Sequence, residues 1–322
     1  MAILRIATAQ ADMTTFGGTM TSDTTYYDST RVDQAFFLNK SETAFLDFPA
    51  AVGTSTWLHA VCAQDGVGVF NDQVTTMVRD ISGNDLASIR IDGNQLYFRV
   101  HGDVFFEGGV TTISVDSAYV VDIQVVINAG VDITVRGYIN SALQFDSVQA
   151  NTAARTNPTK LEFLNTDTGA HEHDNFFSEV IVADEDTRGF RLRELKPQSF
   201  GVFQQWDGTV TSVVDASLAT GISTDVADER TSFGLAKLDQ VDAGDIINRV
   251  VAQSYAQRGA AGLTAMNHFF RYDDTTIQDG ANISLGLFGA WYVDEYVTNP
   301  KTAASWVPAD LEGIQMGVRA RA

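Results

Sequence analysis

The sequence predicts an all-β protein made of two β-sandwich domains in tandem, and three observations carry this prediction. Short apolar or alternating runs recur with turn residues about every 8–12 positions, which is typical of sandwiches and barrels. No stretch before residue 176 has a convincing helical period. The segment Phe176–Trp206 contains a buried strand, a charged exit, a stop at Pro197 and a new strand. We therefore expect domains at 1–195 and 196–322.

In the first domain the clearest element is a hairpin. Leu86–Ile91 and Leu96–Val100 alternate in polarity around Asp92-Gly93, a strong short-range hairpin signal, and Asn94 is expected to lengthen the loop slightly. The chain enters this domain at Ile3–Thr8, before a polar stretch. Further strands are expected at Ala35–Leu38, Ala44–Phe48, Trp57–Ala63, Gly66–Phe70, Val74–Arg79, Tyr119–Ile127, Asp132–Ile139, Leu143–Phe145, Lys160–Leu164 and Phe176–Val182.

The second domain repeats this style with weaker signals. Pro308 suits the first turn of a short helix within Ser305–Ile314, near the C-terminal end. No internal repeat with a fixed period occurs, which argues against a solenoid or propeller. Strands are expected at Phe200–Phe203, Thr209–Val214, Ser232–Ala236, Val250–Ala256, His268–Tyr272, Ile283–Phe288, Trp291–Val297 and Gln315–Ala320.

Composition limits the partners. Of the 322 residues, 41 are acidic and 21 basic, giving a net charge of −20. Such a surface repels phosphate backbones, so nucleic acid is not expected as a partner. Cys62 is the only cysteine and lies in an apolar run, which indicates a buried small hydrophobe and excludes an internal disulfide. No run approaches the roughly 18 apolar residues of a membrane span, so we expect a soluble chain made in a cytoplasm, without membrane insertion.

One cluster has metal-ligand chemistry. His171, His173 and Asp174 could hold a metal if they shared one face of a strand, but they follow a polar stretch, and a solvated loop is the preferred interpretation. Calcium could bind near Asp65 or at Asp273-Asp274, although neither matches a calcium-loop motif. We therefore expect no cofactor and no firm metal site.

Catalytic signatures are missing from the linear sequence. It has no nucleophile elbow, no phosphate-binding glycine loop and no evenly spaced carboxylates of the kind sandwich glycosidases use; Glu179 and Asp122 stand alone in their strands. We therefore expect that the protein is not an enzyme. Trp206, Trp291 and Trp306 are candidates for interface or glycan contact, since flat rings stack on sugar faces and anchor interfaces.

Particular segments carry a family resemblance. Trp57–His59, Ile89–Leu96 and Tyr119–Val125 resemble parts of a concanavalin A-like (LamG-type) jelly roll, which would cover residues 35–195. Val135–Asn140 is similar to a strand and turn of such domains, with Ser141 in place of the usual glycine. The segments 178–189 and 299–318 resemble structural proteins of tailed-bacteriophage virions. The resemblance implies a virion component with two jelly-roll sandwiches and no catalytic residues.

From this resemblance we expect a virion structural protein, tail-associated or a capsid decoration component. It would be assembled in the host cytoplasm and act through contacts with other virion proteins, as a homo-oligomer. The alternative is a carbohydrate-binding adhesin that attaches to host surface glycans through its jelly-roll loops.

Overall fold

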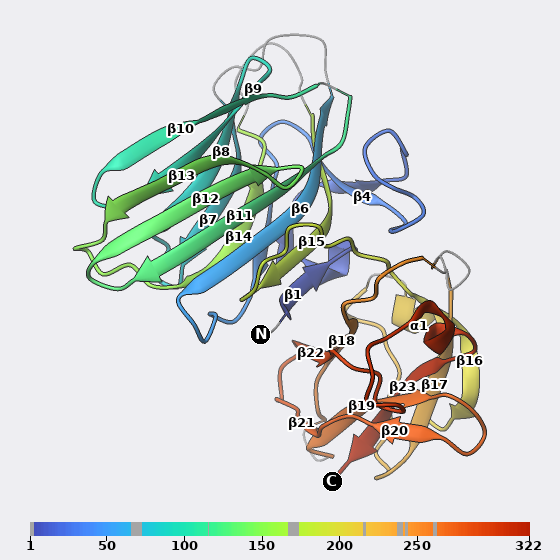
Figure 1. Ribbon diagram of the computed structural model, residues 1–322. Coiled ribbons are helices and arrows are strands. Elements are labelled where there is room, and N and C mark those ends of the chain that lie inside the picture. The colour runs from blue at the N-terminus through green and yellow to red at the C-terminus, as the bar shows by residue number, and fades with distance from the viewer. Residues whose placement is uncertain are drawn as a thin grey trace. The chain divides into compact units, whose positions relative to one another are not determined.

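The computed structural model describes residues 3–65, 73–114, 116–166, 174–214, 217–236, 241, 244–259 and 263–322. Nearly all regular structure in these ranges is antiparallel strand, so the predicted all-β class is confirmed. The chain divides into two compact units, residues 1–192 and 193–322, which are described separately below (Figure 1). The expected strand at 66–70 lies outside the described residues.

The first unit is a sandwich of two antiparallel sheets (Figure 1). In the described residues one sheet has the order β13-β12-β11-β6-β15-β4-β3, with β1 also paired to β15, and the other has the order β10-β9-β8-β7-β14-β5-β2. The strands of the first sheet are β1 (Ile3–Ala7), β3 (Thr19–Thr21), β4 (Ala35–Leu38), β6 (Ser55–Asp65), β11 (Tyr119–Asn128), β12 (Asp132–Ile139), β13 (Ala142–Ala150) and β15 (Asp174–Ala183). Those of the second are β2 (Thr15–Phe16), β5 (Thr43–Asp47), β7 (Gln73–Asp80), β8 (Asp85–Asp92), β9 (Gln95–His101), β10 (Phe105–Thr112) and β14 (Pro158–Leu164).

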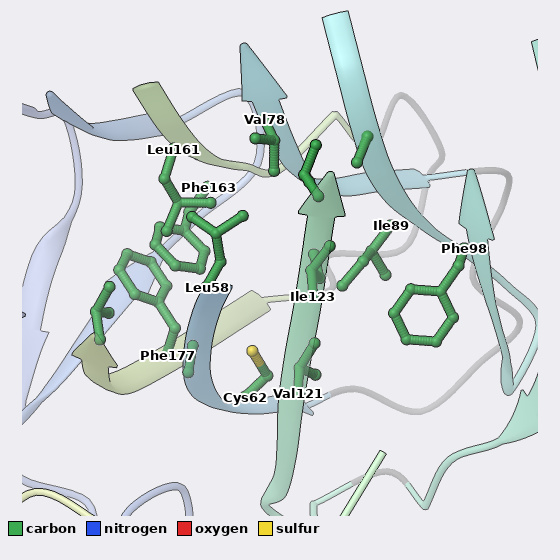
Figure 2. Packing of buried hydrophobic residues seen from close by; sticks show 14 of the residues in the cluster. Leu58, Cys62, Val78, Ile89, Phe98, Val121, Ile123, Leu161, Phe163 and Phe177 are labelled. Carbon is green, nitrogen blue, oxygen red and sulfur yellow. The ribbon is translucent and has the colours of Figure 1, made fainter. Parts of the chain in front are cut away.

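The core lies between these two sheets (Figure 2). Its side chains are the alternate apolar residues of each strand, as a period of two requires. Phe163 of β14 stacks on Phe177 of β15 with ring centroids 3.8 Å apart, which joins the sheets directly. Cys62 lies in this core, where burial raises the pKa of its thiol to about 12. The only cysteine is therefore a packing residue.

Two hairpin turns show how local chemistry fixes the register. Asp92 pairs with Gln95, so the turn contains two residues, Gly93 and Asn94, and Gly93 has φ of 60°. The loop is therefore not lengthened, because Asp92 belongs to the strand. Between β12 and β13, Asn140 and Ser141 have φ of 49° and 66°. Two consecutive left-handed residues are the requirement of a type I′ turn, and Ser141 occupies a position that favours glycine.

The charged segment after β15 covers the outer face of the first sheet. Thr187 is fully buried, and its hydroxyl donates to Asp122 Oδ1 at 2.7 Å. The Arg188 guanidinium lies 4.6 Å from the centroid of the Tyr138 ring. Arg191 forms a bidentate ion pair with Glu179, which is buried in β15 and has a φ of 50°. The segment is thus ordered against the first unit up to residue 192.

The second unit also consists of antiparallel strands. In the residues described, one sheet has the order β16-β17-β23-β19-β20, with β21 also on β19, and a second sheet pairs β18 with β22. Phe270, Trp306, Leu311 and Ile314 form its small apolar core. The strands are β16 (Pro197–Gln204), β17 (Arg230–Leu235), β18 (Val250–Ala256), β19 (Ala265–Arg271), β20 (Ile277–Asp279), β21 (Ile283–Ser284), β22 (Ala290–Tyr296) and β23 (Gln315–Arg321).

Helical structure is confined to short turns in the described residues. The expected strand at Thr209–Val214 is wrong: Thr211–Val214 is the short helix α1. The Thr209 hydroxyl accepts a hydrogen bond from the Ser212 amide, a local cap that outweighs the β-branched composition. Near the C-terminal end the expected short helix is a 3₁₀ turn at Pro308–Leu311 with Pro308 in its first turn. Gln10–Asp12 forms a similar turn in the first unit.

Candidate functional site

The metal candidates do not form a site in the described structure. His171 and His173 lie outside the described residues, and Asp174 begins β15 opposite Asp65 of β6. Asp273 Oδ1 accepts the Thr275 and Thr276 amides, so this carboxylate closes a turn. Among the described residues no group of three or more histidine, cysteine, aspartate or glutamate side chains could hold a metal ion. In the same part of the chain no helix has the length and apolarity to cross a membrane.

The three candidate tryptophans have different environments. Trp306 is only 3% exposed and packs on Phe270 with a centroid distance of 5.7 Å, so in this structure its ring is part of the second unit's core. Its burial arises because the chain around it folds back onto β19. Trp206 is half-buried, and its indole Nε1 donates to the Glu229 carbonyl at 3.1 Å.

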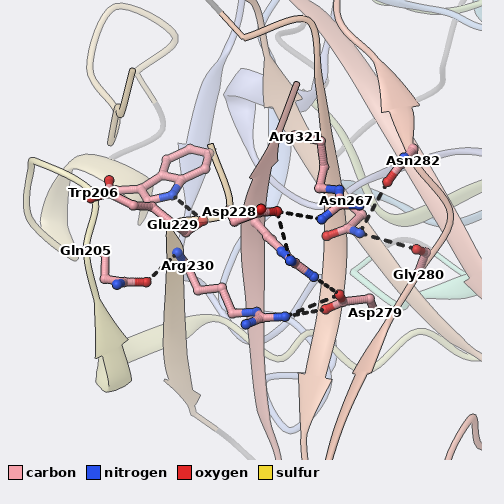
Figure 3. A network of polar contacts seen from close by, with 11 residues as sticks. Gln205, Trp206, Asp228, Glu229, Arg230, Asn267, Asp279, Gly280, Asn282 and Arg321 are labelled. Atoms are coloured by element: carbon pink, nitrogen blue, oxygen red, sulfur yellow. Dashed lines mark hydrogen bonds and ion pairs between the residues drawn. The ribbon is translucent and has the colours of Figure 1, made fainter. Parts of the chain in front are cut away.

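Trp206 borders a polar network on the first sheet of the second unit (Figure 3). Arg230 and Arg319 both donate to Asp279, while Arg319 and Arg321 both donate to Asp228. These guanidinium groups are bound by carboxylates of the same chain. The network therefore links β17, β20 and β23, and it does not present open cationic groups.

Trp291 lies on the outer face of the sheet formed by β18 and β22. Its cross-strand partner is Tyr255, and the two rings meet edge to face with centroids 5.5 Å apart. Tyr255 is 37% exposed and Trp291 is half-buried. Together they form an aromatic pair on a solvent-facing strand surface, which we call the aromatic platform.

The approach to β22 extends the aromatic platform and fixes its geometry. Leu287 and Phe288 precede the strand and are exposed, Phe288 to 87%. A Cβ on Gly289 would lie 2.1 Å from the Tyr255 hydroxyl oxygen, so only glycine lets this ring lie where it does. Four residues after Trp291 in the same strand, and on the same face of β22, Glu295 pairs with Arg249. The platform therefore consists of exposed rings, and the ion pair further along the same face is largely buried.

The inner face of the same two strands carries a hydrogen-bonded chain of three side chains. Ser254 Oγ of β18 lies 2.9 Å from His268 Nε2, and His268 Nδ1 lies 2.7 Å from Asp294 Oδ2 of β22. His268 belongs to β19 and is fully buried, whereas Ser254 and Asp294 are half-buried. The sequence does not reveal this hydrogen-bonded triad, because its residues come from three different strands and share no spacing signal. Knowledge that β18 pairs with β22 would have been needed to place Ser254 near Asp294.

Tyr296 lies beside Asp294 on the inner face. Burial, and then the Asp294 carboxylate, raise the pKa of the Tyr296 phenol. A Cβ on Gly280 would lie 2.5 Å from the Tyr296 hydroxyl and 3.4 Å from Asp294 Oδ2. The carboxylate of Asp294 is therefore held between close neighbours, which limits the orientations it can take.

A third surface feature is an apolar edge of the first unit. Edge strands β10 and β13 belong to different sheets and meet through Thr111 and Gln144, whose side chains are hydrogen-bonded at 2.6 Å. Large apolar side chains are exposed along both, which a single soluble chain usually avoids on edge strands. These exposed residues, which we call the apolar edge, are Val104, Phe105, Phe106, Val110, Leu143 and Val148.

Comparison with known proteins finds only distant structural similarity. No protein-family model and no curated protein sequence matches the chain. An endo-β-1,4-glucuronan lyase from the fungus Trichoderma reesei is similar at a TM-score of 0.43 and 10% identity, over 58% of this chain and 93% of the lyase. A carbohydrate esterase from Shiga toxin-encoding bacteriophage phi24B gives 0.41 and 12%, over 54% and 89%. Botulinum neurotoxin type C gives 0.41 and 9%, over 86% and 72%.

These comparisons correct one expectation. The sequence predicted a protein without enzymatic activity, but several similar structures are polysaccharide lyases and one is a carbohydrate esterase, so that exclusion does not hold. It rested on the absence of contiguous motifs, whereas strands of a sandwich bring together residues that are far apart in sequence. At TM-scores below 0.5 the similarity assigns no substrate and no residue role to this chain.

Proposed function

We propose that this chain is a virion protein of a tailed phage that binds carbohydrate on its host through the aromatic platform. The observation that carries the proposal is the pair of Tyr255 and Trp291 on the outer face of β18 and β22. Aromatic rings at a surface offer flat apolar area at a low cost in side-chain entropy, and the apolar face of a pyranose ring stacks on such area. The pair of Glu295 and Arg249 on the same face is largely buried, with side chains only 14% and 9% exposed, so the proposal rests on ring stacking.

The charge of the chain narrows the ligand class. A net charge of −20 disfavours polyanionic glycans through long-range repulsion. Arg249, at the other end of the same strand pair, is already paired with Glu295. We therefore propose neutral host polysaccharides, recognised through ring stacking, as the ligand.

The test is a screen of neutral and acidic bacterial surface polysaccharides, followed by calorimetric titration of the hits. Trp291→Ala and Tyr255→Ala should each weaken binding about five- to thirteenfold, because about 1–1.5 kcal/mol of stacking is lost. Phe105→Ala is the matched control, since it removes a 52% exposed ring from the other unit. Absence of binding to every neutral glycan would refute the proposal, as would wild-type affinity in the Trp291→Ala variant.

A role in particle assembly is the second candidate, and the apolar edge favours it. Exposed apolar surface on edge strands is what a subunit interface buries. In this proposal the first unit contacts other virion proteins or further copies of the chain, and the protein is assembled into the particle in the host cytoplasm. The test compares the mass of the wild-type chain in solution with that of a Phe106→Asp, Leu143→Asp variant, and locates the chain on particles with a specific antibody. A monomeric wild type together with unlabelled particles would overturn it.

A further inference from the structure

A nucleophile, a base and an orienting carboxylate are arranged in series in the second unit. Asp294 accepts from His268 Nδ1, so the proton of the imidazole resides on Nδ1 and Nε2 is left as an acceptor. The Ser254 hydroxyl, 2.9 Å from Nε2, then donates to it. Hydroxyl, imidazole and carboxylate linked in this order are the recurring solution for activating serine, on unrelated folds and in any chain order.

Two other histidines in the described residues show that this order is not a trivial result of burial. His59 Nδ1 also meets a carboxylate, Asp122, at 2.8 Å, but the nearby Thr187 hydroxyl bonds to that carboxylate and His59 Nε2 has no partner. His101 Nε2 meets Ser88 at 2.8 Å, but its Nδ1 has no carboxylate bonded to it in the described residues. Of the three histidines that the structure describes, only His268 has both a hydroxyl on Nε2 and a carboxylate on Nδ1.

We infer that Ser254, His268 and Asp294 form an acyl-transfer site that hydrolyses short-chain carboxylic esters, such as O-acetyl groups. Ser254 Oγ attacks the ester carbonyl carbon while its proton moves to His268 Nε2. The carbon–oxygen bond to the alcohol then breaks, and the alcohol leaves with that proton. Water next adds to the acyl-enzyme, again giving its proton to Nε2, and the acid departs as Ser254 Oγ takes the proton back.

The surroundings of Ser254 set the substrate size. On the same face of β18 its neighbours two residues away are the small side chains of Ala252 and Ala256, while Tyr292 of β22 lies directly opposite, so a short acyl group suits this site better than a long one. In the described residues β18 pairs only with β22, so alternate backbone amides of β18 point away from the sheet. An oxyanion formed at Ser254 would be stabilised by backbone amides of this kind. Asp294 does not touch the substrate and acts as a positioning residue.

This inference is independent of the carbohydrate proposal, because its test needs no glycan. The full-length chain is treated with a fluorophosphonate probe, which bonds only to activated serine, and the adduct is located by peptide mass spectrometry. Hydrolysis of p-nitrophenyl acetate is followed in parallel. We expect a single adduct at Ser254, and loss of both adduct and esterase activity in Ser254→Ala.

Three variants separate activation from a structural effect. Ser88→Ala, which removes the serine bonded to His101, should leave labelling unchanged. Asp294→Asn should slow labelling about 10³–10⁴-fold at an unchanged melting temperature, because the amide no longer fixes the Nδ1–H tautomer. Asp294→Glu should restore part of the rate, which a purely structural role would not produce. A folded wild-type chain whose Ser254 labels no faster than Ser88 would overturn the inference.

Discussion

Removal of Arg191 should destabilise the first unit more than removal of any exposed arginine. The Glu179 carboxylate is fully buried and accepts three hydrogen bonds, two from the Arg191 guanidinium at 3.0 and 2.7 Å and one from the Leu192 amide at 3.0 Å. These contacts also raise the pKa of Arg191. Arg191→Ala would leave a buried negative charge with one donor.

The loss of stability in Arg191→Ala can be estimated from the burial of the two side chains. Breaking a fully buried ion pair costs about 3–5 kcal/mol. Because the Arg191 side chain is 35% exposed, water can reach part of the vacated space, and we expect about 2–3 kcal/mol. For a unit of this size that corresponds to a melting temperature lower by about 5–10 °C. Scanning calorimetry of the full chain at pH 7 measures the shift, and hydrogen exchange in β15 assigns the transition.

Two further variants decide the cause. Arg136→Ala removes an arginine whose pair with Asp146 is exposed on both sides, and it should cost no more than about 1 kcal/mol. Adding Glu179→Gln to Arg191→Ala should recover much of the loss, since the charge that lacked a partner is then gone. If Arg191→Ala loses no more stability than Arg136→Ala, the reasoning is refuted.

Two other predictions concern single positions. Ser141→Gly should raise the stability by about 0.5–1 kcal/mol in denaturant titration, because φ of 66° strains serine but not glycine; an unchanged midpoint would contradict this. Cys62 should resist a thiol reagent at pH 8 until the first unit unfolds, since burial raises the pKa of its thiol from 9.0 to about 12. A raised pKa means that the Cys62 thiol holds its proton more tightly in the folded state than in the unfolded state. The free energy of unfolding should therefore fall as the pH rises from about 9 to about 12, and Cys62→Ala should abolish this part of the pH dependence. Fast labelling of Cys62 in native buffer would contradict the prediction that its thiol is inaccessible in the folded unit.

Local signals explain which parts of the fold were predictable. The strands around Asp92-Gly93 follow from alternation and turn chemistry, both of which act within a few residues, and the predicted strand at Val250–Ala256 is observed with those bounds. Trp306 could not be assigned in this way, because its burial depends on contact with Phe270, 36 positions earlier in the chain. Elements fixed by neighbouring residues could therefore be predicted from the sequence, whereas burial that depends on a partner far along the chain could not.

The candidate sites also depend on contacts between residues that are far apart in sequence. Strand alternation predicts that the two sites lie on opposite faces of β18, and this prediction can be tested. Ser254 and Tyr255 are consecutive in β18 and therefore point to opposite faces, one toward buried His268 and the other toward Trp291. The acyl-transfer chain and the aromatic platform thus share two strands but no side chain. Trp291→Ala should leave fluorophosphonate labelling intact, and Ser254→Ala should leave glycan affinity intact. Loss of both properties in either variant would mean that the sheet itself was disrupted, and it would remove the independence of the two proposals.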